Sequence, residues 1–214
     1  MINNNKYKKD YYKSIIEYFK INIYCIIVIT ICTLSLSYYS DKKYMKGLNT
    51  IIIVSYISWL FHYLMHNYNK YNPISKIHLI THHSDYKDTF LGKCIEYFFI
   101  EFIFFGPGLL LILNIILQTY YNVHILNSYI ILFWGILIIT IHEIYYHTLD
   151  NTNYHEIHHY HQDTNYSAEM WDIVNNTKKK GTPIENNNKM IPFILVITVC
   201  IIPFIKCKYD RIRL

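Results

Sequence analysis

Long apolar tracts alternate with short polar segments along this chain. The first tract carries no charge between Lys20 and Asp41, and later tracts cover residues 47–66, 97–118 and 125–141. A helix needs about 20 apolar residues to cross a bilayer. The pattern therefore predicts an all-α integral membrane helical bundle with about four transmembrane helices.

Prolines interrupt the third tract and a last, shorter one. Pro107 removes a backbone donor inside the third tract and predicts a kink, so this tract is either one bent span or a re-entrant hairpin. The last apolar stretch, residues 190–205, has Pro192 and Pro203 near its ends. If this stretch crossed, the basic C-terminal tail would lie opposite the other basic ends. An interfacial or re-entrant helix is therefore favoured.

These tracts divide one functional unit into three parts. Residues 1–20 form a basic N-terminal segment, residues 21–177 the membrane domain, and residues 178–214 a basic linker, the short apolar helix and a basic tail. The first tract follows a polar lead and precedes no small-residue cleavage pattern, so we interpret it as a lasting anchor instead of a signal peptide.

Composition supports the membrane interpretation. Hydrophobic residues make up 52% of the chain and charged residues 16%, whereas soluble domains carry about 25% charged residues. Part of the formal net charge of +5 lies in the basic ends and in residues 178–180, which could touch anionic lipid or an acidic partner. The five cysteines show no CxxC spacing and are interpreted as buried free thiols.

The second and fourth tracts both end in histidines. If the third tract crosses once, the ends of the second and fourth tracts emerge on one side of the membrane. The basic N-terminus places that side in the cytosol by the positive-inside rule. The segment "DKKYMK", residues 41–46, lies on the far side and weakens this assignment without reversing it.

Ten of the 12 histidines gather in four clusters, "HYLMH", "HLITHH", "HEIYYH" and "HEIHH". Side chains three or four residues apart share one helix face, with Cβ atoms about 5–6 Å apart, so two such imidazoles can chelate one metal. The members of a doubled histidine point about 100° apart and could serve two neighbouring metals. Ten nitrogens suit two metals better than one. The candidate metal ligands are His62, His66, His78, His82, His83, His142, His147, His155, His158 and His159.

Imidazole ligands suit iron, zinc and copper alike, so spacing alone leaves the metal open. Any one of these clusters alone would more often consist of polar interfacial residues. His161 could be a ligand or a plain surface residue, and His124, on the predicted far side, has a structural role in this interpretation. Nearby carboxylates could accept the second ring N–H of ligand histidines: Glu143, Glu156, Asp163 and Asp172.

The order of the clusters, HxxxH, HxxxHH, then a histidine pair and HxxHH after two crossings, resembles the fatty acid hydroxylase/sterol desaturase superfamily of membrane di-iron oxygenases. The resemblance covers about residues 50–177 and includes the segment "NYSAEMWDIVNNT". In that segment Ser167, Asn175 and Asn176 depart from the family pattern, whereas five residues match it: Asn165, Tyr166, Trp171, Asp172 and Thr177.

The resemblance implies a membrane-bound catalytic domain that hydroxylates or desaturates a fatty acyl, sphingolipid or sterol substrate. It implies two iron ions on the ten histidines and dioxygen as cosubstrate. It further implies a site that faces the cytosol from the endoplasmic reticulum membrane. No nucleotide- or haem-binding motif occurs in the chain, so electrons would come from an external donor such as cytochrome b5. The resemblance does not identify any catalytic residue beyond the metal ligands, and no nucleic-acid partner is expected.

Three alternatives stay open. A membrane acyl-lipid desaturase uses three histidine boxes and a similar topology. A metal-ion transporter would place histidines and acids near the middle of the membrane, whereas here they gather at helix ends. A non-catalytic relative that keeps the fold is the third alternative.

Overall fold

The computed structural model describes residues 4–67, 72–83, 89–141, 154–166 and 168–212. Within these ranges the regular structure is helical and contains no strand, which confirms the predicted all-α class. In chain order the elements are α1 (Asn4–Tyr39), α2 (Tyr44–Asn67), α3 (Pro73–His82), α4 (Phe90–Ile95), the π-helix η2 (Glu96–Phe105), α5 (Gly108–Tyr121), α6 (Ser128–Thr140), α8 (Tyr154–Tyr160), α9 (Glu169–Val174), the 3-10 helix η4 (Asn187–Met190) and α10 (Ile191–Ile212).

Three of these helices are long and apolar enough to cross a membrane. They are α1 over Tyr11–Tyr39, α2, and the segment Asn187–Cys207, which comprises η4 and most of α10. A fourth span results if Phe90–Phe104 and Gly108–Tyr121 count as one broken helix. The lengths and compositions of these helices indicate an integral membrane protein with three or four spans. The set differs from the predicted one. Residues 125–141 were predicted to cross, but α6 has only 13 residues and is a shorter apolar helix, whereas the segment Asn187–Cys207 was not predicted to cross.

The predicted kink in the third tract is confirmed. The two halves are bent by 52° at the break that contains Pro107. The segment before the break consists of α4 and the π-helix η2, and Gly106 is the C-cap of η2. Pro107 cannot donate a backbone hydrogen bond, so it disrupts the helical ladder at this point.

The last apolar segment differs from the prediction of a short interfacial or re-entrant helix. It forms α10, a helix of 22 residues that packs along α1 and α6. Pro203 lies inside α10 and does not end it. Its outward side chains are apolar and exposed, as Val196 at 62% and Val199 at 65% show. Such a surface suits lipid contact, so length and packing favour a crossing helix.

The helix α6 lies at the centre of the bundle and contacts α2, η2, α5 and α10. Its Ile130, Ile131 and Phe133 are fully buried. It crosses η2 very closely at Gly135, because a Cβ added there would lie 2.8 Å from the carbonyl oxygen of Gly106. The crossing therefore depends on two glycines, as is common where membrane helices approach closely.

All five cysteines are free, as predicted, but only Cys25 and Cys32 are buried. Cys94, Cys200 and Cys207 are exposed. The prediction of buried thiols was wrong for these three because an apolar membrane helix also presents apolar residues on its outer, lipid-facing surface.

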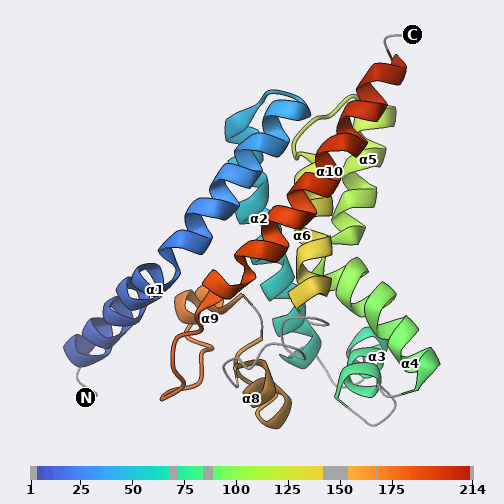
Figure 1. The fold of residues 1–214 in the computed structure, drawn as a ribbon. Helices are drawn as coiled ribbons and strands as arrows, with labels where there is room; N and C mark the ends of the chain where they lie inside the picture. Colours follow the sequence, from blue (N-terminus) through green and yellow to red (C-terminus); the bar gives the residue numbers. More distant parts are fainter. Residues whose placement is uncertain (1–3, 68–71, 84–88, 142–153, 167, 213–214) are drawn as a thin grey trace.

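The two ends of the bundle carry different elements (Figure 1). The N-terminus, the C-terminal end of α2, and helices α3, α8 and α9 lie at one end. The α1–α2 turn, the α5–α6 loop and the C-terminus lie at the other end. The histidine-bearing helices α2, α3 and α8 therefore share one end of the molecule, in agreement with the predicted topology.

Candidate metal centre

Five histidines from three helices converge at the end of the bundle where α2 ends. They are His62 and His66 from α2, His78 and His83 from the end of α3 and the residue after it, and His158 from α8. One ring nitrogen from each lies within 4.8 Å of those of all the others. We call these residues the five-histidine group. It joins parts of the chain that are up to 96 residues apart, since His62 and His158 both belong to it.

The helix α2 places its two histidines one turn apart on the same face. The ring centroids of His62 and His66 are 5.1 Å apart, as the i, i+4 spacing predicts. His62, His78 and His158 are each fully buried. His66 and His83 are half-buried, so the group is buried on one side and partly accessible on the other.

The contacts within the group centre on His66. Its Nε2 lies 2.8 Å from Nε2 of His78 and 3.2 Å from Nε2 of His158. Two nitrogens that bind one ion at about 2.1 Å and at right angles would lie about 3 Å apart. The observed separations therefore fit ligands of a shared metal ion.

A backbone carbonyl fixes the tautomer of His158. Its Nδ1 lies 2.7 Å from the carbonyl oxygen of Thr164. A carbonyl oxygen can only accept, so Nδ1 carries the proton and donates it. In the neutral ring, Nε2 then presents its lone pair to the group. This is the usual arrangement behind a metal-binding histidine.

The electrostatics of the group also suit a cation. Burial lowers the pKa of His78 well below its ordinary value, and the neighbouring imidazoles of His66, His83 and His158 lower it further. The ring is therefore neutral near pH 7. Neutral imidazole is the form that binds metals, so this donor set could hold a metal ion.

The other five predicted ligands fall into three groups. His159 is described and lies beside the group, with its ring centroid 4.8 Å from that of His83. It is separated from His158 by 6.0 Å between centroids. His82 and His155 lie on α3 and α8, but their side chains are outside the described part. His142 and His147 lie outside the described residues altogether.

Tyr166 covers one side of the group. It is only 1% exposed, and its ring centroid lies 5.6 Å from those of both His66 and His158. Its hydroxyl accepts a hydrogen bond from Nδ2 of Asn67 at 2.7 Å. Burial raises the pKa of Tyr166 to about 12, so this phenol stays protonated beside the histidines.

Asp172 is a buried hub that ties together the elements around the group. Its carboxylate accepts hydrogen bonds from Nε1 of Trp59 at 2.9 Å and from the hydroxyl of Tyr154 at 2.6 Å. It also accepts a hydrogen bond from the hydroxyl of Thr177. Helices α2, α8 and α9 are thereby joined at one carboxylate.

Comparison of this chain with protein-family models, with curated proteins and with solved structures finds no match. The site is therefore interpreted from its own geometry.

Two of the remaining carboxylates that were predicted to support the histidines lie on the protein surface, and the third is not described. Glu156 and Asp163 are exposed, and Glu143 lies outside the described residues. The acceptor for the outer nitrogen of His158 is a backbone carbonyl, which no sequence pattern indicates. Trp59 and Tyr154 were also not predicted. Trp59 precedes His62 by three residues, so its place on the same face of α2 was a usable signal.

The positions of the two remaining histidines are clear. His161 is exposed and lies outside the five-histidine group. His124 is exposed in the α5–α6 loop, at the end of the bundle opposite the group. Its Nε2 lies 2.9 Å from Oδ1 of Asn122.

Proposed function

We propose that this protein is a membrane-bound di-iron oxygenase that hydroxylates or desaturates a lipid, using dioxygen and external electrons. The observation that carries the proposal is the convergence of five histidine nitrogens within 4.8 Å at the end of an apolar helical bundle. The order of the histidine clusters, which resembles that of the fatty acid hydroxylase/sterol desaturase superfamily, supports it.

Under this proposal the five-histidine group binds one iron ion. The five remaining candidate ligands would hold a second iron: His82, His142, His147, His155 and His159. When bound, the two irons supply the activation of dioxygen that removal of hydrogen from an unactivated C–H bond requires. The protein supplies position and exclusion of water.

Three residues of the chain position the ligands without binding the metal themselves. Thr164 holds the His158 ring through its carbonyl oxygen. Asp172 accepts hydrogen bonds from Trp59 of α2 and Tyr154 of α8 and so joins the two helices. Tyr166 packs on the rings of His66 and His158 and separates them from solvent. These contacts restrict the orientations of the imidazoles and of the helices that carry them, which favours tight binding.

The position of the group supports a lipid as the substrate. The ligands lie at and just beyond the ends of spanning helices, so a lipid can approach from the bilayer without leaving it. A fatty acyl chain, a sphingolipid and a sterol all meet this condition. An electron donor such as cytochrome b5 would approach the same end, which we assign to the cytosolic face of the endoplasmic reticulum membrane.

Metal analysis with matched variants tests the proposal directly. The wild type, purified without chelators, is expected to hold about two iron ions per chain. His158→Ala is expected to lose metal, whereas His161→Ala, at an exposed position outside the group, is expected to keep it. Equal metal content in the two variants would argue against the assigned ligands.

A lipid profile of host cells tests the reaction. Cells that express the wild type or His161→Ala should contain a hydroxylated or newly unsaturated lipid that is absent with His158→Ala. A new lipid that persists in His158→Ala would exclude the five-histidine group as the active site. A full metal complement with no new lipid would favour a non-catalytic metal protein.

One observation favours the alternative of a metal-ion transporter. Glu101 is fully buried in η2, within the broken span, and ionisable groups inside membrane helices often mark ion pathways. Metal flux into vesicles that contain the purified protein separates the two functions. A transporter would show flux that Glu101→Gln abolishes, whereas the oxygenase is expected to show none.

A further inference from the structure

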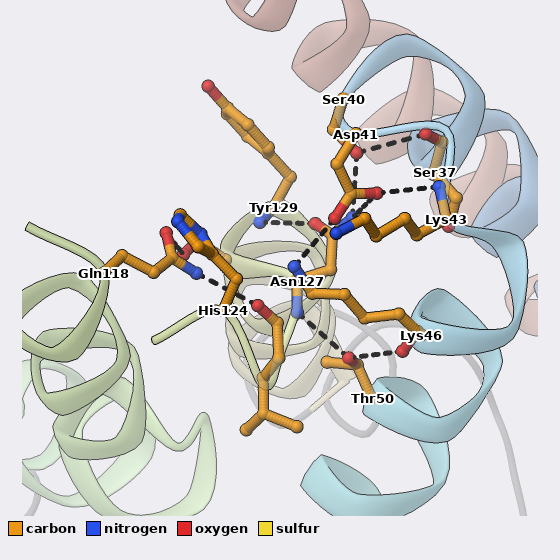
Figure 2. A network of polar contacts seen from close by, with 12 residues as sticks. Ser37, Ser40, Asp41, Lys43, Lys46, Thr50, Gln118, His124, Asn127 and Tyr129 are labelled. Carbon is orange, nitrogen blue, oxygen red and sulfur yellow. Dashed lines mark hydrogen bonds and ion pairs between the residues drawn. The ribbon is translucent and has the colours of Figure 1, made fainter. Parts of the chain in front are cut away.

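A cavity of about 760 Å³ lies at the end of the bundle opposite the five-histidine group. It is bounded by the α1–α2 turn, α5, the start of α6 and α10. Its polar wall includes Lys43, Lys46, Gln118 and Asn127 (Figure 2). We call it the lysine cavity. Its volume falls within the range of about 300–1,000 Å³ that is typical of small-molecule sites.

Hydrogen bonds between distant segments hold the polar wall in place. Nδ2 of Asn127 donates to the hydroxyl of Ser40 at 2.8 Å, and its backbone N–H donates to the hydroxyl of Thr50 at 3.0 Å. On the α5 side, Nε2 of Gln118 donates to the carbonyl oxygen of Leu126 at 3.1 Å. The α1–α2 turn and the α5–α6 loop are thus joined before any ligand arrives.

The wall carries a net positive charge. Among the residues that line the cavity, all within the described part of the chain, two lysines accompany the single acid Asp41. Asp41 forms an ion pair with Nζ of Lys46 at 2.7 Å. The backbone N–H of Lys43 donates to Oδ1 of Asp41 at 3.1 Å (Figure 2). Within the described part of the chain, no carboxylate forms an ion pair with the exposed side chain of Lys43, which lines the cavity. Lys206 adds charge at the same end, because its Nζ lies 4.7 Å from the ring centroid of Tyr39.

The opposite wall is apolar. Leu111 and Ile115 from α5, Leu132 from α6 and Phe204 from α10 contribute to it. Ile115 is 47% exposed and Phe204 is 61% exposed. Both belong to candidate membrane helices, so hydrocarbon chains of the bilayer can reach them. The cationic wall lies at the helix ends and the apolar wall runs along the helices. These two walls match the anionic head group and the acyl chains of a phospholipid.

We propose that the lysine cavity binds an anionic phospholipid of the leaflet away from the histidines. The phosphate lies near Lys43 and Lys46, and an acyl chain lies along Ile115 and Phe204. A lipid fits better than a free anion because the apolar wall would otherwise have no occupant. The assignment gives a role to the basic segment 41–46, and it does not depend on a metal or a reaction at the other end.

Lipid selectivity of the full chain provides the test. The protein is reconstituted in vesicles of equal parts phosphatidylcholine and phosphatidylglycerol, and spin-labelled forms of each lipid report the bound fraction. The wild type is expected to prefer phosphatidylglycerol. Lys43→Gln is expected to reduce that preference about five-fold, which is the contribution of one lysine near a membrane surface. Lys42→Gln, an exposed neighbour outside the cavity lining, is expected to keep it.

Two further arms separate the possible ligands. Ile115→Trp narrows the apolar wall at an exposed position and is expected to lower phosphatidylglycerol binding. Inorganic phosphate alone should not displace the bound lipid. No lipid preference in the wild type, or equal loss in Lys42→Gln and Lys43→Gln, would overturn the proposal. Displacement by inorganic phosphate together with unchanged binding in Ile115→Trp would also overturn it, in favour of a soluble anion.

Discussion

The two ends of this bundle carry different kinds of nitrogen-containing side chains. At one end, imidazoles that are fully buried at His62, His78 and His158 face one another. At the other end, lysine ammonium groups face a cavity that is open to solvent or lipid. Neutral, dehydrated nitrogens present lone pairs and suit a metal cation. Charged, hydrated nitrogens present protons and suit a phosphate.

The polar networks around the two ends differ in the same way. Asp172 at the histidine end is fully buried and accepts from uncharged donors, a tryptophan and a tyrosine. Asp41 at the lysine end pairs with a lysine, and both side chains keep part of their exposure, at 24% and 14%. Breaking the hydrogen bonds of a buried carboxylate lowers the free energy of unfolding strongly, whereas a partly exposed ion pair contributes little to it. The histidine end should therefore be far more sensitive to substitution.

Removal of the Asp172 carboxylate is expected to have the largest effect. In Asp172→Ala the N–H of Trp59 and the hydroxyl of Tyr154 lose their acceptor inside the protein. Each unsatisfied donor costs about 1–3 kcal/mol, so the free energy of unfolding should fall by about 2–6 kcal/mol. Thermal unfolding in detergent measures the loss, and metal content should fall with it. Asp163→Ala, at an exposed position, serves as the control.

The conservative variant Asp172→Asn sharpens this test. Its side-chain carbonyl can still accept one hydrogen bond, so stability should lie between those of the wild type and Asp172→Ala. Identical unfolding temperatures for Asp172→Ala and Asp163→Ala would mean that the buried hub does not support the histidine end.

The glycine contact between η2 and α6 should be the next most sensitive position. An alanine Cβ at Gly135 would lie 2.8 Å from the carbonyl oxygen of Gly106, so the helices must separate. Overpacking of this kind costs about 1–3 kcal/mol. Thermal unfolding of Gly135→Ala measures it. Gly181→Asn is the control for added volume, because nothing lies within 4 Å of the Cβ position of Gly181. Its φ of +86° strains any side chain, asparagine less than most, so a smaller loss of stability is expected there.

The sequence predicted the parts of this fold that depend on composition and on local spacing. Apolar length predicted the first two membrane helices and the broken third, and Pro107 predicted the break, whereas the fourth tract forms the shorter helix α6. The i, i+4 spacing placed His62 and His66 on one face of α2. Each of these follows from a rule that acts over one or two helical turns.

The features that the sequence did not predict depend on partners far along the chain. The glycine pair Gly106 and Gly135 is a tertiary contact, and the support of His158 by a backbone carbonyl carries no side-chain signature. The length of α10 was underestimated because prolines were taken to limit it, although Pro203 lies within the helix. Neighbouring helices can compensate for a proline in a membrane bundle, which a single-chain pattern cannot show.

The pH dependence of the stability of the metal-free protein is expected to come from the histidine end of the bundle. The pKa of His78 is lowered in the folded state, mainly by burial, from an ordinary value of 6.5. The neutral folded ring therefore contributes stability above this pH. The contribution is lost as the pH falls below it, because the unfolded chain takes up a proton that the folded chain does not.

The unfolding temperature of the metal-free protein should accordingly fall on acidification through about pH 6.5. His78→Asn should weaken the pH dependence, since the substituted side chain does not titrate. Lys43→Gln at the other end should leave it unchanged. A wild-type unfolding temperature that stays constant through this range would contradict the buried, neutral state assigned to the histidine.

The smallest effect is expected at the Lys46–Asp41 ion pair. Both side chains keep solvent contact, so the attraction between them is screened and contributes about 0–1 kcal/mol. Lys46→Gln should therefore change the unfolding temperature only slightly, although it should reduce the binding of phosphatidylglycerol. A loss of stability as large as that in Asp172→Ala would show that the lysine end also supports the fold, and the contrast between the two ends would then fail.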